Sequence, residues 1–252
     1  MKKFILYSLY TCFLLSAFNC SKESASKSES AISTGAGGST ARFTINGNYL
    51  YVVDNTGLKT FDITNPLTPV YKGKKELGLN IETIFPYGNK LFIGSSTTMY
   101  IYSVETPDNP ALIASARYQI RMACDPVVAN ETVAYATLRA SGPCGGGVSQ
   151  LVVYNIQNPS RPVLANTVSL NDPYGLGMQG NALYVCERDG GLKVFDIASQ
   201  YAPVFKTTIT GERFLDVIPY GDVLIAQVQG GMALYDITAN PLEPVFIAKI
   251  NN

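Results

Sequence analysis

The chain has 252 residues, of which 46% are apolar and 15% charged, and its 19 basic and 19 acidic residues leave no net charge. This length allows one large all-β domain or two small domains. Neutrality argues against a nucleic-acid partner or an anionic membrane surface, because both favour a basic face. The sequence contains no His and no Trp, which removes Ser-His-Asp and Cys-His catalysis and His-rich zinc sites.

The N-terminus has the composition of an export signal. Lys2 and Lys3 precede an apolar run that ends at Phe18 and is too short and too polar for a comfortable membrane span. The run stops at Ala17-Phe18-Asn19-Cys20, which is similar to a bacterial lipoprotein signal, in which the cysteine is lipidated and becomes the mature N-terminus. We therefore expect residues 1–19 to be a signal peptide and Cys20 to carry the lipid, with ordinary secretion as the alternative. The protein would then be exported and anchored to the bacterial cell envelope, at the outer membrane or the periplasmic face.

A polar segment follows the signal. Residues 20–40 are rich in Ser, Gly and Ala, with scattered Lys and Glu and no apolar period. Such a segment cannot bury enough apolar surface to offset the entropy of ordering it. We predict a flexible tether here, followed by a folded domain in residues 41–252.

The rest of the chain repeats one pattern five times. The clearest copy reads Gly-Leu-Lys-Val-Phe-Asp-Ile from Gly191 and ends at Pro203. The closing prolines are 41, 52, 41 and 41 residues apart, at Pro69, Pro110, Pro162, Pro203 and Pro244. Each copy has an aromatic residue at the same place: Phe61, Tyr102, Tyr154, Phe195 and Tyr235. A strand-rich period of about 40 residues is typical of one blade of a β-propeller.

Each repeat contains four strand-sized segments. In the second copy these are residues 82–87, 90–94, 99–104 and 111–116. Gly88-Asn89 is a hairpin sequence between the first two segments, and a two-proline turn separates the last two. The third segments are apolar on both faces, so we expect each blade to be covered by a neighbour on both sides. We predict an all-β fold, a five-bladed β-propeller of four-stranded antiparallel blades.

Asp or Asn follows the recurring aromatic in four copies, and Ser103 follows it in the second copy. The Asp and Asn residues are Asp62, Asn155, Asp196 and Asp236. Such side chains accept backbone N–H bonds in turns, so we interpret them as structural and predict no metal site and no cofactor.

Part of the fourth copy carries a family resemblance. Asn-Ala-Leu-Tyr-Val at residues 181–185, the repeat from Gly191 and the two-proline turn together resemble the LVIVD-repeat family, a group of bacterial β-propeller repeats that are often lipoproteins. The resemblance covers about residues 41–250. Copies one and four match best, and copy two departs from the pattern with Met-Tyr-Ile-Tyr-Ser from Met99. It implies a fold and a location, but no substrate and no catalytic residue.

The 52-residue step marks an insertion between the second and third strands of blade three. It brings residues 138–148, with Cys144, to the propeller face where the inner strands begin, close to Cys124. Because an exported domain is in an oxidising compartment, we predict a Cys124–Cys144 disulfide, with two unpaired thiols as the alternative. Closing a loop of this size stabilises by about 3 kcal/mol in the chain-entropy description. Cys186 has no evident mate and is expected in the core.

Polar residues collect on the same face. They stand at or beside the start of each inner strand and in the inserted loop: Arg42, Glu82, Asp125, Arg139, Tyr174 and Asp216. Functional residues concentrate on loops over a rigid scaffold. We interpret these six as a binding face around the channel mouth, with solvated rim residues in local salt bridges as the alternative.

Two functions fit these features. The first is a non-catalytic binding or interaction module, a monomeric domain that presents its loop face to a protein or a glycan from a lipid anchor. The second is a carboxylate-dependent glycoside hydrolase that uses Glu82, Asp125 and Asp216, which requires one protonated and one ionised carboxyl group. Nothing in the spacing indicates such a pair, so we expect binding rather than enzyme activity.

Overall fold

Five antiparallel sheets of four strands each follow one another along the chain. A computed structural model describes residues 38–119, 126–141 and 147–252, all of which lie in one unit of the chain, Ile32–Asn252. Within these described ranges no helix is long and apolar enough to cross a membrane. The sheets confirm the predicted all-β fold, with one four-stranded blade for each sequence repeat.

The strands are numbered β1 to β20 in chain order. Blade one contains β1 (Phe43–Asn46), β2 (Tyr49–Val53), β3 (Gly57–Asp62) and β4 (Val70–Glu76). Blade two contains β5 (Ile81–Tyr87), β6 (Lys90–Ser95), β7 (Thr98–Ser103) and β8 (Ala111–Arg117). Blade three contains β9 (Val127–Ala129), β10 (Val133–Leu138), β11 (Gln150–Asn155) and β12 (Val163–Ser169). Blade four contains β13 (Leu176–Gln179), β14 (Ala182–Glu187), β15 (Gly191–Asp196) and β16 (Val204–Ile209). Blade five contains β17 (Phe214–Tyr220), β18 (Val223–Val228), β19 (Gly231–Asp236) and β20 (Val245–Asn251).

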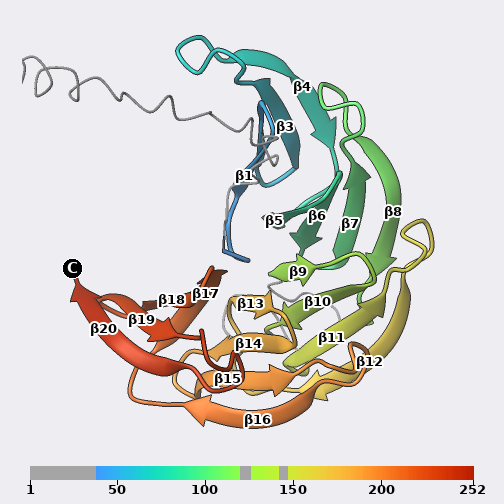
Figure 1. Ribbon diagram of the computed structural model, residues 1–252. Helices are drawn as coiled ribbons and strands as arrows, with labels where there is room; N and C mark the ends of the chain where they lie inside the picture. The colour runs from blue at the N-terminus through green and yellow to red at the C-terminus, as the bar shows by residue number, and fades with distance from the viewer. Residues whose placement is uncertain (1–37, 120–125, 142–146) are drawn as a thin grey trace, which may run out of the picture. The chain divides into compact units, whose positions relative to one another are not determined.

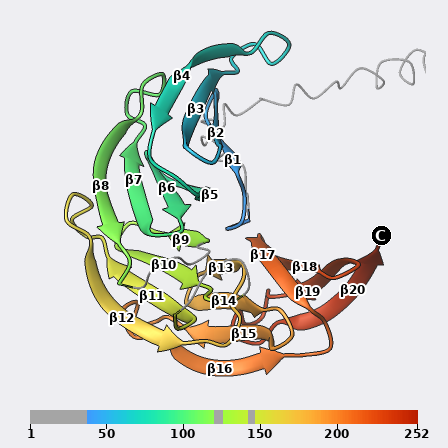
Figure 2. The same cartoon turned by 180° about the vertical axis from the view of Figure 1, so that it is seen from behind.

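Each blade pairs its strands in sequence order, so its first and fourth strands are the two edges of the sheet. Figures 1 and 2 show β1, β5, β9, β13 and β17 nearest the common centre and the fourth strands at the periphery. Successive inner strands contact one another from β1 through β5, β9 and β13 to β17. The starts of these strands therefore lie around one channel mouth, and the inner hairpins lie at its opposite end.

Glycine leads the inner hairpin turn in four blades. Gly47, Gly88, Gly180 and Gly221 have φ between 55° and 59°, a left-handed conformation that a Cβ makes costly. Each is followed by Asn48, Asn89, Asn181 or Asp222, none of which has a positive φ, so these two-residue loops are type II′ hairpin turns with Gly at the first central position. The hairpin predicted at Gly88-Asn89 is confirmed.

The polar residue after the recurring aromatic organises the turn between the third and fourth strands. Asp62 Oδ1 accepts the backbone N–H of Thr64 at 2.9 Å, and Asp196 Oδ1 accepts that of Ala198 at 2.9 Å. The corresponding bonds from Gln157 to Asn155 and from Thr238 to Asp236 measure 3.0 and 2.8 Å. These are Asx turns, so the structural interpretation of the four residues is confirmed.

Every blade also has a β-bulge that sequence reasoning missed. The register between the third and fourth strands shifts immediately before the recurring aromatic, at Thr60/Phe61, Ile101/Tyr102, Val153/Tyr154, Val194/Phe195 and Leu234/Tyr235. A bulge bends and twists a strand locally. In blades four and five the aromatic packs edge-on against an outer-strand ring, with centroid distances of 5.8 Å for Phe195–Phe205 and for Tyr235–Phe246.

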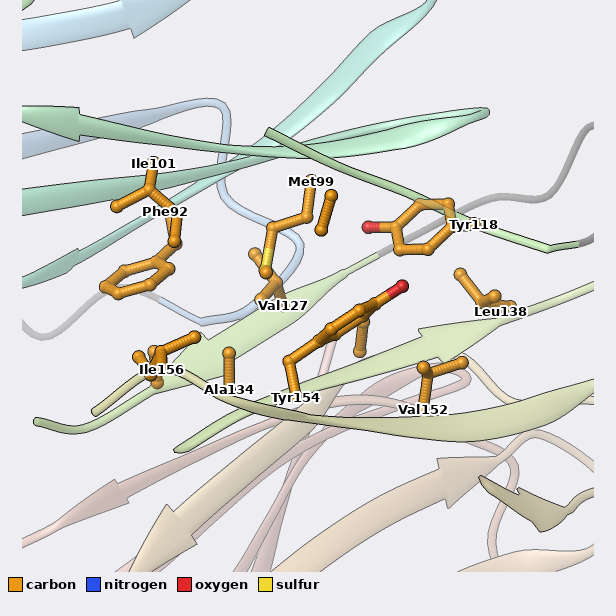
Figure 3. Close-up of a cluster of buried hydrophobic side chains, with 13 residues drawn as sticks. Phe92, Met99, Ile101, Tyr118, Val127, Ala134, Leu138, Val152, Tyr154 and Ile156 are labelled. Atoms are coloured by element: carbon orange, nitrogen blue, oxygen red, sulfur yellow. The ribbon is translucent and has the colours of Figure 1, made fainter. Parts of the chain in front are cut away.

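The hydrophobic core is divided among the spaces between successive blades. Figure 3 shows one such cluster, in which Phe92 and Met99 of blade two face Val127, Val152 and Tyr154 of blade three. Three further clusters fill the spaces between blades one and two, three and four, and four and five. Burial of apolar area between blades is thus the main stabilising contribution.

Strand β15 explains why the third strands are apolar on both faces. Leu192 and Val194 pack in the cluster shared with blade five, whereas Phe195 packs in the cluster shared with blade three. All three are at most 2% exposed. The expectation of neighbours on both sides is confirmed for this strand.

Blades one and five, at the two ends of the series, are each left uncovered on one side by the part of the chain that the structure describes. Among the described residues no hydrophobic cluster joins blade five to blade one. Phe43 on β1 is 60% exposed and Met232 on β19 is 42% exposed, whereas Leu176 and Leu192 at the matching positions of blade four are fully buried. The expectation that every blade is covered on both sides therefore does not hold at the two ends of the series.

Candidate functional site

A pocket of about 200 Å³ lies at the channel mouth. Its lining consists of Thr40, Arg42, Glu82, Thr83, Pro126, Arg139, Pro173 and Tyr174. Arg42, Glu82, Arg139 and Tyr174 come from four different blades, at the start of an inner strand or directly after β10. Four of the six residues predicted for the binding face are thus gathered in one pocket, which combines two guanidinium groups, a carboxylate and a phenol.

Tyr174 orients two guanidinium groups at this mouth. Nη1 of Arg139 and Nη1 of Arg188 each donate a hydrogen bond of 2.8 Å to the Tyr174 hydroxyl oxygen. The Arg139 guanidinium carbon also lies 4.0 Å from the centre of the Tyr174 ring, within the range of a cation–π contact. Thr137 Oγ1 donates to the backbone carbonyl of Tyr174 at 2.6 Å. The ring and the backbone of Tyr174 are therefore both held in place. Because Arg139 is bonded to and stacked on this ring, its side chain is positioned before any ligand binds.

The charges of these two arginines are balanced differently. Arg188 pairs with Asp172 at 3.0 Å and with Asp189 at 3.4 Å. None of the ion pairs found between described residues involves Arg139. Arg139 therefore brings to the pocket a positive charge that the described carboxylates leave unpaired.

Arg42 is anchored on the other side of the pocket. Its Nη2 donates to Asn55 Oδ1 at 3.0 Å and to the carbonyl oxygen of Ile81 at 3.2 Å. A guanidinium group has five N–H donors in a fixed plane. Two bonds from one nitrogen therefore fix the plane and leave donors on the remaining nitrogens for a ligand.

The described ends of the inserted loop lie at the same mouth. The backbone N–H of Ala140 donates to Ser149 Oγ at 3.2 Å, which closes the base of the loop. Ser141 Oγ donates to Asp172, the partner of Arg188. The expectation that the insertion lies on the face where the inner strands begin is confirmed for these residues.

Asp216 has a different role from the one predicted. It is 6% exposed, and its carboxylate accepts hydrogen bonds from the Ser39 hydroxyl at 3.0 Å, the Thr40 hydroxyl at 2.6 Å and the Val217 N–H at 2.9 Å. Ser39 Oγ in turn accepts the N–H of Leu176 at 2.7 Å. The carboxylate thus fastens the segment before β1 to the inner strands of blades four and five. This corrects the assignment of Asp216 to an exposed binding face, because the preceding segment covers it.

The packing around Asp216 explains two glycines. A Cβ at Gly38 or at Gly175 would overlap the Asp216 carboxylate. Burial raises the pKa of Asp216, while the hydrogen bonds from Thr40, Val217 and Ser39 oppose that shift. Gly175 stands where other blades start their inner strand with a polar side chain, and its lack of a side chain makes room for the carboxylate of the next blade.

Several predicted residues lie outside the described part of the chain. These are Cys20, Cys124, Asp125 and Cys144, so the lipidation, the disulfide and the role of Asp125 stay predictions. Cys186 lies in β14 with no exposed surface, which confirms its place in the core, and burial raises the pKa of its thiol. In the described residues no group of three or more Asp, Glu or Cys side chains is arranged to hold a metal ion.

Sequence reasoning missed Arg188, although a usable signal existed. Arg139 directly follows β10 and Arg188 directly follows β14, so both stand where a second strand ends. The loops after second strands lie on the mouth face in every antiparallel blade. Applying that rule to all five blades would have selected Arg188 together with Arg139.

The sequence pattern has a match among known protein families. The family model of the LVIVD repeat matches residues 37–75 and 175–210. This chain carries LVIVD repeats. The matched segments correspond to blades one and four, the two copies expected to fit best.

Solved structures resemble the fold of this LVIVD-repeat chain. The periplasmic gluconolactonase of Pseudomonas aeruginosa aligns with a TM-score of 0.63 and 15% identity, over 81% of this chain and 68% of that one. A protein of unknown function from Desulfotomaculum acetoxidans aligns with a TM-score of 0.65 and 13% identity, over 81% of this chain and 66% of that one. A protein from Bacteroides fragilis named as a candidate 6-phosphogluconolactonase aligns with a TM-score of 0.63 and 12% identity, over 83% of this chain and 69% of that one. At these identities the likeness shows the fold alone. A search of curated proteins finds no match to the chain.

Proposed function

We propose that the chain is a non-catalytic, lipid-anchored β-propeller of the cell envelope that binds its ligand in the mouth pocket. The main support is the convergence of Arg42, Glu82, Arg139 and Tyr174 from four blades on one pocket. The five copies differ at these positions, so the repeated scaffold does not require these side chains. Polar residues that the scaffold does not need, gathered over a rigid core, are typical of a binding site.

The charges of the pocket favour a ligand with a carboxylate or a similar anion. Arg139 offers a planar fork that matches a carboxylate bidentately, and its stacking on Tyr174 reduces the entropy lost on binding. Glu82 adds an acceptor to the wall, which suits a ligand that also carries hydroxyl or amide donors. Acidic glycans and acidic protein segments both have this chemistry.

Calorimetric titration of the purified protein with trigalacturonate and with a short Asp/Glu-rich peptide tests the proposal and distinguishes the two ligand sources. Arg139→Ala should weaken binding of the preferred probe by about tenfold or more, equivalent to about 1.4 kcal/mol, and added salt should weaken it in the wild type. Arg161→Ala is the matched control, because Arg161 is exposed in the turn between β11 and β12 at the opposite end of the same blade. Failure of both probes to bind, or equal binding by the Arg139 and Arg161 variants, would contradict the proposal.

A hydrolase is the second candidate, because two of the similar structures are named as lactonases. The glycosidase arrangement expected from Glu82, Asp125 and Asp216 loses support at Asp216, whose carboxylate is enclosed by the segment before β1. Glu82 is the described carboxylate that lines the pocket. Turnover of gluconolactone or of nitrophenyl glycosides that disappears in Glu82→Gln would replace the binding proposal with a hydrolase. Rates equal to those in buffer would support binding.

The lipid anchor is the second part of the proposal and has its own test. Cys20 follows the apolar N-terminal segment and precedes a run of polar residues, an arrangement that would place the propeller on a tether. The predicted tether of residues 20–40 is shortened at its end, because Ser39 and Thr40 are hydrogen-bonded to Asp216 and belong to the folded domain. Cells fed a labelled fatty acid should incorporate label into the wild-type protein and not into Cys20→Ala. Equal labelling of both would contradict lipidation at this cysteine, and surface proteolysis of intact cells would report which side of the envelope the domain faces.

The Cys124–Cys144 disulfide is the third part. Oxidised protein should resist alkylation at both thiols until reductant is added, as measured by intact mass. Alkylation of Cys124, Cys144 and Cys186 in unfolded, unreduced protein would rule the bond out.

A further inference from the structure

A second pocket lies at the other end of the propeller, between blades one and two. Its volume is about 380 Å³, within the range of roughly 300–1,000 Å³ typical of small-ligand sites. It is lined by Asn46, Gly47, Asn48, Tyr49, Tyr51, Gly88, Asn89, Val104 and Pro107. These residues belong to the β1–β2 and β5–β6 hairpins and to the turn after β7. In an antiparallel blade those turns lie opposite the start of the first strand, so this pocket is separate from the mouth pocket.

The floor of the pocket is part of the repeated scaffold. Tyr51 is fully buried and its hydroxyl donates to the backbone carbonyl of Pro107 in the next blade at 3.1 Å. The same bond recurs from Tyr135 to Gln200 and from Tyr184 to Pro241, both at 2.6 Å. Tyr51 therefore holds neighbouring blades together, and its presence needs no ligand.

Tyr49 departs from the repeat. It is the first residue of its second strand, and the residues at the same position of the other blades are Lys90, Val133, Ala182 and Val223. The fold is therefore compatible with small or charged side chains at this position. The Tyr49 ring lies beside the Tyr51 ring, with centroids 6.3 Å apart and planes inclined by 23°. The Tyr49 ring therefore gives this pocket an aromatic wall that no other blade repeats at this strand position.

Polar groups surround the aromatic wall. Asn46 Nδ2 donates to the Gly88 carbonyl at 2.9 Å, as Gln179 does to Gly221, so only its Oδ1 and second N–H are left for a ligand. No hydrogen bond between described side chains involves the Asn48 amide. A hydrogen bond to Asp108 raises the pKa of the Tyr49 hydroxyl, so this carboxylate lies at the hydroxyl end of the ring.

The charges around this pocket argue against an anionic ligand. Asp108 is nearly half exposed and forms an ion pair with Lys72 at 3.2 Å, so the positive charge of Lys72 is already balanced and does not attract an anion. Asp62 lies opposite Tyr49 in the strand register, and Glu105 accepts a bond from Asn89 at 2.8 Å. An aromatic face combined with the amide groups of Asn46 and Asn48, and with acidic residues nearby, suits a ring that is apolar on one side and carries hydroxyl groups at its edge.

We propose that this pocket is a carbohydrate subsite that takes one neutral pyranose ring, stacked on Tyr49, with the sugar hydroxyls bonded to Asn46 and Asn48. Neither the mouth pocket nor its anionic ligand is needed for this assignment. Stacking buries the apolar face of the sugar against the ring, and each hydroxyl replaces a water at a group that is already oriented.

Saturation-transfer NMR and calorimetry on the purified full-length protein test the subsite with cellobiose, maltose, lactose and N,N′-diacetylchitobiose. At least one of these should bind, with saturation strongest on the protons of one sugar face. Tyr49→Val should weaken that binding by about tenfold or more, equivalent to about 1.4 kcal/mol, whereas Tyr49→Phe should keep most of it because the ring remains. Valine at this position already occurs at Val133 and Val223, so the fold tolerates it. Tyr220→Val is the control, because Tyr220 is a 66% exposed tyrosine at the inner hairpin of blade five.

Three results would overturn the subsite: no binding of any of the four sugars, unchanged binding by Tyr49→Val, or equal loss in Tyr49→Val and Tyr49→Phe. Arg139→Ala, which should remove anion binding at the mouth, should leave sugar binding unchanged. A loss of sugar binding in Arg139→Ala would place the sugar at the mouth and also overturn the assignment.

Discussion

Replacement of Asp216 by Ala tests whether one buried carboxylate fastens the start of the propeller to its last two blades. The carboxylate accepts hydrogen bonds from Ser39, Thr40 and Val217. Hydrogen bonds to a charged group contribute about 1.5–3 kcal/mol each, but burial of the charge offsets part of that sum and raises the pKa of Asp216. We expect Asp216→Ala to lower the free energy of unfolding by about 3 kcal/mol, a value typical of breaking a buried polar network.

Urea unfolding followed by tyrosine fluorescence measures this loss. With a denaturant slope of about 2 kcal/mol per molar urea, the midpoint should fall by about 1.5 M. Asp222→Ala is the control, because Asp222 is exposed in the hairpin at the opposite end of the same strand pair. Hydrogen exchange adds a local readout, since the Leu176 N–H bonds to Ser39 Oγ at 2.7 Å and should lose protection when Ser39 is released. Equal midpoints for the two variants, with unchanged protection of Leu176, would refute the reasoning.

The same carboxylate predicts a pH dependence of stability. Its folded-state pKa is raised above the ordinary Asp value of about 3.9, so the folded protein binds more protons than the unfolded chain between the two values. The contribution of Asp216 to stability therefore falls as pH rises through that window and is constant above it. Asp216→Asn removes the titration, so the stability of this variant relative to wild type should rise with pH across the window. A relative stability that falls with pH would contradict the sign.

Three further predictions concern the packing between blades. Tyr184→Phe removes the bond to the Pro241 carbonyl and should cost about 1 kcal/mol in urea unfolding; a cost near zero would show that the bond does not hold blades four and five together. Gly175→Ala should destabilise because its Cβ overlaps the Asp216 carboxylate, and the loss should be smaller in the Asp216→Ala background; additive losses would locate the strain elsewhere. Cys186 should resist iodoacetamide in the native protein and react fully in urea, as followed by peptide mass, because it is buried and its thiol pKa is raised; rapid native labelling would contradict that packing.

The amino-acid sequence alone determined the repeated scaffold of this protein. The closing prolines, the glycine-led hairpins and the Asx residues after four of the five aromatics are local signals, and each acts within a few residues of its own position. They predicted the strands of all five blades because the turn chemistry and the strand alternation act locally. The copies that depart from the repeat also predicted the mouth residues Arg42, Glu82, Arg139 and Tyr174.

Only the tertiary structure decided the roles of the residues that depart from the repeat. Asp216 and Ser39 are 177 residues apart in sequence but are joined by a hydrogen bond, so no local pattern could show that this carboxylate is enclosed rather than displayed. Tyr174 acquires its two guanidinium partners because loops from neighbouring blades end at one mouth, and Tyr49 lines a pocket only because the turn of blade two lies beside it. Local propensity is set by near neighbours along the chain, whereas a site is set by contacts between strands that are distant in sequence.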